Sequence, residues 1–338
     1  MRYKYISTAV IAVVFLTSCS SLSSTLKSVT PAPIEKNLLS GRPGVNGALL
    51  VVKIDDTNAA HPQIGLEDAD VVYIEQVEGG LTRLAAVFSS VIPTRVGPVR
   101  SARISDIEIL SQYGRVAFAY SGAQKKLLPV IAAANIANLG AQAQSPTIYT
   151  TDPTRNSPFA MVLRADLLMQ RVKEKGYVVD SAKSVGWSFG DEKTVGVPIT
   201  QAVLHWPAAQ YTVIWSPTDN RWHLNHNNEP DLSDTGRVLG PTTFVIQLLS
   251  ITPSIYHDKF GGVTPFSNTV GSGSGYILRD GKSFTATWSR SSSAVGTTWS
   301  GLDGKELAFA PGQVWVALTD TEPDFTLIPA SAKPSPTK

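Results

Sequence analysis

The sequence predicts an α+β protein, in which an N-terminal α/β domain is followed by a mostly β C-terminal domain. Two observations lead to this prediction. Residues 42–190 alternate apolar runs of strand length with segments of helical periodicity, whereas residues 191–328 hold only short strand-like runs separated by turn residues. A hydrophobic content of 43% is enough to build the cores of two ordinary domains.

The elements expected in residues 42–190 follow from local patterns. Apolar runs predict strands at 47–54, 71–75 and 81–88, and Glu78-Gly79-Gly80 predicts a hairpin turn between the last two. Ser105 and Glu108 have the spacing of a capping box, so a helix is expected to begin there. A further strand at 116–120 and helices at 125–134 and 158–175 complete the predicted domain.

In residues 191–328 the pattern predicts six strands, at 202–206, 211–215, 242–249, 276–278, 283–288 and 314–318. Asp219-Asn220 and Asp280-Gly281 supply turns between them. The glycine-rich run 271–275 leads into a strand rather than a helix, which favours close backbone packing over a dinucleotide loop. The tryptophans of this half either fill the core, which is the usual role of aromatics, or line a groove for sugars.

The N-terminus has the layout of an export signal. Arg2 and Lys4 precede an apolar run over 6–16, which is shorter than the roughly 20 residues needed to span a bilayer. Residues 16–19, Leu-Thr-Ser-Cys, resemble the lipobox read by bacterial lipoprotein signal peptidases. We therefore expect residues 1–18 to be a signal peptide and Cys19 to be lipidated, which would attach the protein to the cell membrane on its extracytoplasmic side.

The composition of the two ends predicts little structure. Residues 19–41 are expected to form a flexible tether, and residues 329–338 a disordered tail, because Ser-, Thr- and Pro-rich segments cannot offset the entropy of ordering. Cys19 is the only cysteine, so no internal disulfide can form. Without the signal peptide the chain carries 27 basic and 27 acidic residues, which does not indicate a nucleic-acid partner.

The segment 94–103, Thr-Arg-Val-Gly-Pro-Val-Arg-Ser-Ala-Arg, places three arginines in a loop just before an expected helix N-terminus. Guanidinium groups and free backbone N–H groups at such a place favour a phosphate or carboxylate. Arg95, Arg100 and Arg103, with Arg83, are therefore candidate ligand-binding residues. The alternative is internal pairing with acidic residues of the same half, namely Glu75, Glu78, Asp106 and Glu108.

Two further groups of residues could carry chemistry. Glu75 and Glu78 would form an acid–base pair if the turn at Gly79-Gly80 directed both into one cleft. His223, His226 and Glu229 lie three apart, but the surrounding asparagines and Pro230 predict a polar loop rather than a metal site. We expect neither a metal nor a cofactor.

Several segments resemble the YerB-like family of bacterial lipoproteins, whose two domains are catalogued as domains of unknown function. The resemblance rests on residues 62–66, 69–73 and 75–83, above all on the arginine segment 95–103, and later on 271–275, 280–282, Trp288, 304–306 and 312–315. It implies an α/β first domain, a β-rich second domain and a surface lipoprotein, with no reaction attached. Where the family has Pro-His pairs, this chain has Asn156 after Arg155, and Asp231 after Pro230, which disfavours imidazole catalysis.

These observations favour a non-catalytic binding module for an anionic cell-envelope ligand, either a cell-wall polymer or an envelope protein. Glu75 and Glu78 are kept among its candidate ligand-contacting residues. One alternative is an enzyme on a cell-wall polymer with Glu75 or Glu78 as general acid or base. Another is a scaffold in which the arginines are paired internally.

Overall fold

The computed structural model describes residues 34–328. The predicted signal peptide, Cys19 and the predicted tail at 329–338 lie outside these residues, as does most of the predicted tether. The prediction of an α+β fold is wrong. The structure is mostly β, with 42% strand and 12% helix, and its strands form one large mixed sheet rather than an α/β domain beside a β domain.

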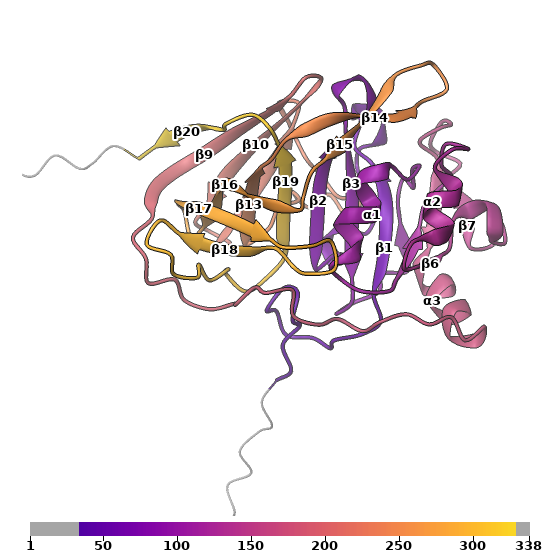
Figure 1. The fold of residues 1–338 in the computed structure, drawn as a ribbon, viewed down its shortest axis with the longest axis horizontal. Coiled ribbons are helices and arrows are strands. Elements are labelled where there is room, and N and C mark those ends of the chain that lie inside the picture. Colours follow the sequence, from indigo (N-terminus) through magenta and orange to yellow (C-terminus); the bar gives the residue numbers. More distant parts are fainter. Residues whose placement is uncertain (1–33, 329–338) are drawn as a thin grey trace, which may run out of the picture. The chain divides into compact units, whose positions relative to one another are not determined.

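The large sheet has 15 strands, and its main path runs β12-β11-β10-β9-β17-β16-β13-β19-β2-β3-β1-β5-β6 (Figure 1). In the first half its strands are β1 (Leu50–Asp55), β2 (Val71–Gln76), β3 (Thr82–Phe88), β5 (Val116–Ala119) and β6 (Ile136–Asn138). In the second half they are β9 (Val197–Trp206), β10 (Ala209–Ser216), β11 (Arg221–His226), β12 (Glu229–Pro230), β13 (Thr243–Leu248), β16 (Gly271–Arg279), β17 (Lys282–Arg290), β18 (Thr298–Gly301), β19 (Val314–Thr319) and β20 (Asp324–Leu327).

The two halves of the chain meet within this sheet. Strand β19, near the end of the chain, pairs in parallel with β2, with Val316 opposite Tyr73, while its other edge pairs with β13. A strand buried on both faces at the middle of a sheet requires apolar residues at successive positions, and all six residues of β19 are buried. The hydrogen-bond ladder therefore continues from one half into the other.

The predicted hairpin around Gly79-Gly80 is present. Strands β2 and β3 pair antiparallel, and both glycines adopt positive φ angles in the connecting turn. Gly80 also approaches the neighbouring β9–β10 turn so closely that a Cβ would lie 2.4 Å from a side-chain carbon of Pro207. Only glycine fits both demands, so the turn is fixed by conformation and by packing.

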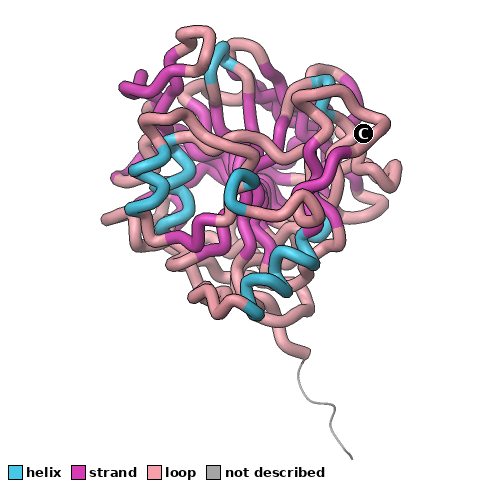
Figure 2. The backbone as a smooth tube through the Cα atoms, turned by 90° about the vertical axis from the view of Figure 1, so that its right-hand side faces the viewer, coloured by secondary structure: helices cyan, strands magenta, loops and turns pink. Residues whose placement is uncertain are grey.

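In the part of the chain that the structure describes, three α-helices lie outside the sheet, where Figure 2 shows helices around the central strands: α1 (Ile104–Ser111), α2 (Leu128–Ala133) and α3 (Ala165–Glu174). Short 3-10 turns occupy Asn58–Ala60, Leu66–Asp68, Glu78–Gly80 and Ala141–Ala143. Helix α1 begins one residue earlier than predicted. The carboxylate that caps its N-terminus belongs to Asp106, whose Oδ2 accepts the N–H of Arg103 at 2.6 Å, and not to Glu108.

The predicted helix over 158–175 corresponds partly to a strand. Its early apolar residues form β8 (Met161–Arg164), which pairs with β4 (Arg95–Val96) and β7 (Tyr149–Thr151), and only then does α3 begin. Helical spacing cannot distinguish the end of a short strand from the start of a following helix. The strands of two or three residues, β4, β6 and β7, are too short to give a detectable pattern of their own.

The apolar residues form two cores, one on each face of the sheet. On β1, Leu50, Val52 and Ile54 belong to one core, and Val51 belongs to the other, which α1 covers with Ile109. The tryptophans largely fill these cores, since five of the six in the second half are buried: Trp206, Trp222, Trp288, Trp299 and Trp315. Within residues 34–328, every helix is too short or too polar to traverse a lipid bilayer.

Candidate functional site

The predicted arginine segment runs alongside the end of β1. The N–H of Arg100 donates to the carbonyl of Lys53 at 2.8 Å, and the N–H of Ala102 to that of Gly122 at 2.9 Å. These bonds hold the segment over the sheet face that carries Arg83 on β3. Arg83, Arg100 and Arg103, which are apart in the sequence, are thereby brought to one place.

The three arginines line a cleft of about 720 Å³, which we call the arginine cleft. Its other walls are the loop 123–127, with Lys125 and Lys126, and the hairpin of β14 (Ile251–His257) and β15 (Val263–Ser267), which lies at the top of Figure 1. Lys259 at the tip of this hairpin also faces the cleft. Six lysine and arginine side chains and only two acidic ones, Glu78 and Asp258, line it.

Arg103 is held by Glu78. Its Nε and Nη2 donate to Glu78 Oε2 at 2.8 and 2.7 Å, and the other carboxylate oxygen accepts the hydroxyl of Thr264 from β15. Burial raises the pKa of Glu78, but the bonds from Arg103 and Thr264 outweigh it, and the net pKa is lowered. Glu78 is therefore ionised at neutral pH and fixes the position of Arg103.

Arg100 is held by Asp55, the last residue of β1. Its Nε donates to Asp55 Oδ2, and its guanidinium carbon lies 5.7 Å from the centre of the Phe159 ring, within the range of a cation–π contact. The second oxygen of Asp55 accepts bonds from the N–H and hydroxyl of Thr57 at 2.8 and 2.6 Å. The carboxylate of Asp55 is thus fully engaged without Arg83.

Arg83 differs from its two neighbours because no acidic residue among those described forms an ion pair with it. It is only 8% exposed, and Nη1 donates to the carbonyl of Ser101 at 2.8 Å. The residues opposite it on the adjacent strands are Asp55 and Glu75, and both carboxylates are bound by other cations. Burial and the charges of Arg103 and Arg100 lower the pKa of Arg83 to about 9, so it stays a cation at neutral pH.

Glu75 lies away from the cleft, in what we call the lysine cluster of Lys53, Glu75 and Asp106. Lys53 Nζ bonds to both carboxylates, 2.9 Å from Asp106 Oδ1, and all three side chains are fully buried. Burial and the nearby charge of Asp106 raise the pKa of Glu75 to about 7 despite Lys53. The structure therefore does not bring Glu75 and Glu78 into one cleft.

The remaining candidates lie elsewhere. Arg95 is 47% exposed, lies 3.7 Å from Asp152, and borders a separate pocket of about 600 Å³. Glu108 binds Thr269 and so does not compensate the charges of the cleft arginines.

The region around His223 is not a loop. His223 and His226 lie on β11 and point to opposite faces of the sheet, and Glu229 lies on β12. This polar segment is extended because its residues pair with Tyr211 to Trp215 on the neighbouring strand β10.

Several cleft residues were missed by the sequence reasoning. Lys125 and Lys126 were assigned only to a helix, and Lys259 and Thr264 lie on a hairpin that was not predicted. The lysine pair is the one signal that could have been used. The hairpin is placed beside the arginines by contacts such as that between Thr264 and Glu78, which spans 186 positions and which a single sequence does not display.

Comparisons with known proteins match both halves of the chain. Residues 38–178 match the description "Protein of unknown function (DUF3048) N-terminal domain", and residues 202–316 match its C-terminal domain. A relative from Bacillus subtilis (strain 168), named "Putative lipoprotein YerB", is 22% identical over 271 residues, which cover 79% of this chain and 80% of the relative.

The fold also resembles a solved structure. The crystal structure of the YerB protein from Bacillus subtilis superposes with a TM-score of 0.71 at 19% identity, over 85% of this chain and 97% of the other. The family expected from the arginine segment and the later glycine run is therefore confirmed.

Proposed function

Because the chain belongs to the DUF3048 family, to which the resemblance to YerB also points, we propose that it is a membrane-anchored lipoprotein on the extracytoplasmic side that binds an anionic cell-envelope ligand in the arginine cleft. The anchor would be the lipid on Cys19, and binding would involve no reaction. The name of the Bacillus subtilis relative supports the assignment as a lipoprotein.

The observation that carries the binding proposal is the buried charge of Arg83. A buried cation without a counter-charge costs several kcal/mol in folding, so it is retained only where another requirement outweighs stability. Both carboxylates opposite it already serve other cations. A phosphate or carboxylate entering the cleft would supply the missing negative charge to a planar fork of N–H donors.

The flanking residues support the same ligand class. Arg100 and Arg103 are fixed by Asp55 and Glu78, so their guanidinium groups need little ordering when a ligand arrives. Lys125, Lys126 and Lys259 line the cleft with exposed side chains and would attract an anion from solution. Glu78 is less suited to act as a general acid, because its lowered pKa keeps it ionised.

The experiment is a capture of envelope components by the full chain. Arg83→Met is compared with Arg95→Met, which removes an equally charged side chain of the same half outside the cleft. We expect wild type and Arg95→Met to retain the same set of solubilised envelope components, identified by mass spectrometry, and Arg83→Met to lose one or more of them. If a folded Arg83→Met protein retains the whole set, the cleft is not the binding site.

A further inference from the structure

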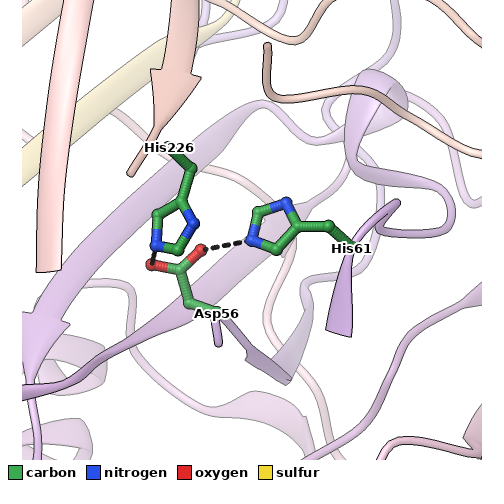
Figure 3. Close-up of side chains that lie close together, drawn as sticks. All are labelled: Asp56, His61 and His226. Carbon is green, nitrogen blue, oxygen red and sulfur yellow. Dashed lines mark ion pairs between the residues drawn. The ribbon is translucent and has the colours of Figure 1, made fainter. Parts of the chain in front are cut away.

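A second cluster of polar side chains lies on the opposite face of the sheet, at the same end of β1 as the arginine cleft. Asp55 faces the arginines, and Asp56, the next residue, faces the other way. There the carboxylate of Asp56 faces one nitrogen of His61 and one of His226, whose imidazole rings are stacked on each other (Figure 3). We call Asp56, His61, His226 and the adjacent Gln63 the histidine cluster.

The ligand atoms of this cluster are already close together. His61 Nε2 lies 3.6 Å from Asp56 Oδ1, and His226 Nε2 lies 3.8 Å from Asp56 Oδ2. Donors at about 2.0–2.1 Å from a tetrahedral zinc ion are roughly 3.3–3.4 Å apart. The ligand atoms of Asp56, His61 and His226 all lie within 4.8 Å of one another, and the two imidazole rings are stacked with their centres 4.5 Å apart. Because the two histidines face different oxygens of Asp56, zinc binding requires these side chains to move together and one ring to turn until its Nε2 lone pair points at the ion.

The cluster holds unpaired polar atoms in its interior. His226 is 4% exposed, and its Nε2, which points at Asp56, makes no hydrogen bond among the described residues. The Oε1 of the buried Gln63 also has no partner there. Native proteins leave few buried polar groups unsatisfied, and an ion is one of the usual reasons when several gather at one place.

Gln63 can complete the coordination. Its Nε2 lies 3.1 Å from His61 Nε2 and 3.3 Å from Asp56 Oδ1. Rotating the side-chain amide by half a turn exchanges Nε2 and Oε1. The unpaired Oε1 then takes the present position of Nε2, at the distances from His61 and Asp56 that are expected between two ligands of one metal ion. Asp56, His61, His226 and Gln63 then offer one carboxylate oxygen, two imidazole nitrogens and one amide oxygen.

The surroundings hold these ligands as they are held in metal sites. Asp231 is fully buried and accepts a hydrogen bond from His61 Nδ1 at 2.9 Å, which leaves Nε2 of the neutral ring as a lone pair directed at Asp56. Tyr211 donates to Asp56 Oδ1 at 2.7 Å and Thr82 to Oδ2 at 2.5 Å. A divalent cation would balance the two buried carboxylates, Asp56 and Asp231, when both imidazoles are neutral.

We propose that Asp56, His61, Gln63 and His226 bind a structural Zn²⁺ ion that links the two halves of the chain. Three ligands come from the first half, on and after the end of β1, and His226 is the last residue of β11 in the second half. Four protein ligands with little exposed surface form a closed site, which is the pattern of structural rather than catalytic zinc. Bound zinc should therefore stabilise the folded chain.

The rival occupant is a proton. Burial lowers the pKa of His61, but its bonds to Asp231 and Asp56 raise it to about 10, so an imidazolium at His61 could compensate the two carboxylates by itself. That arrangement leaves His226 Nε2 without a partner, which zinc does not. The two occupants differ in whether His226 is needed.

The test uses the full chain, freed of metal with a chelator and titrated with zinc chloride by calorimetry. We expect one zinc ion per wild-type chain, and no binding by His226→Ala. His223→Ala is the matched control, because His223 lies on the same strand with its side chain on the opposite face, 2.9 Å from Asp219. Asp231→Asn, which alters only the residue behind His61, should weaken binding about 10- to 100-fold.

Two results would overturn the proposal: a wild-type chain that binds no zinc, or equal binding by His226→Ala and His223→Ala. If His226→Ala does not fold, judged by circular dichroism, the Co²⁺-substituted wild type decides the question. Its visible and X-ray absorption spectra should show four-coordinate cobalt with two imidazole ligands, and a six-coordinate, water-rich spectrum would refute the site.

Discussion

Two buried cations on the same face of the sheet, Lys53 on β1 and Arg83 on β3, have opposite surroundings. Lys53 is fully buried and bonds to Glu75 and Asp106, so its charge is more than compensated. Arg83 is nearly as buried, but the carboxylates opposite it serve Arg100 and Lys53, and its charge faces a cleft. One cation is part of the scaffold, and the other is available to a ligand.

The comparison shows that pairing, and not burial or residue type, distinguishes a structural charge from a binding charge. A buried charge with good partners contributes to one defined fold, whereas a buried charge without them weakens the fold and strengthens any anion complex. Substitutions at the two positions should therefore change stability in opposite directions.

The largest effect is expected at Lys53. Lys53→Met would leave the carboxylates of Glu75 and Asp106 buried beside each other without a cation, which should lower the free energy of unfolding by about 3–5 kcal/mol. Urea unfolding followed by circular dichroism measures this, with the exposed Lys282→Met on β17 as the control. Equal midpoints for the two variants would show that the lysine cluster is not a structural element.

The next effect concerns pH. In the folded state burial and Asp106 raise the pKa of Glu75 from 4.5 to about 7, so the folded protein holds a proton that the unfolded chain releases between these values. The contribution of Glu75 to stability is therefore present below about pH 4.5 and is lost as the pH rises through 7, by roughly 3 kcal/mol. Glu75→Gln should remove this part of the slope. Parallel curves of unfolding free energy against pH for the two proteins would contradict the assignment.

A smaller effect of opposite sign is expected at Arg83. Arg83→Met removes a buried charge that has no carboxylate partner among the described residues and keeps most of the apolar volume, so the variant should be more stable than wild type by about 1 kcal/mol. Thermal and urea unfolding in a chloride buffer without phosphate, pyrophosphate or sulfate measure this. A loss of stability like that of Lys53→Met would mean that Arg83 is structural after all.

The smallest effect is expected at Arg95. Its side chain is 47% exposed and 3.7 Å from Asp152, so Arg95→Met should change the free energy of unfolding by less than about 0.5 kcal/mol. This variant defines the effect of losing a charge at the surface. A change above about 1 kcal/mol would remove it as a control for Arg83.

The sequence predicted the elements whose signals are local. The strands β1, β2 and β3, the turn at Gly79-Gly80 and a helix near Ser105 could be identified because each depends on a few consecutive residues. The sequence also grouped Arg83, Arg100 and Arg103, which the structure brings to one cleft. It did not separate Arg95 from the others, because that requires the pairing of β4 with β8 across nearly seventy residues.

The fold class was wrong for the same reason. The sequence of a strand such as β19, buried between strands from both halves, does not show which strands are its neighbours, so the large mixed sheet shared by both halves could not be predicted. The histidine cluster could not be predicted because His61 and His226 are separated by about half of the chain, whereas His223 and Glu229, which are near His226 in sequence, point elsewhere.

The most direct test of the central claim is the effect of pyrophosphate, a small anion with clustered charge, on thermal unfolding of the full chain. We predict that it raises the unfolding temperature of wild type and of Arg95→Met alike, and leaves Arg83→Met unchanged, because only Arg83 gains a missing counter-charge. An equal rise in all three proteins, or none in wild type, would contradict the claim that the unpaired charge of Arg83 is kept for an anionic ligand.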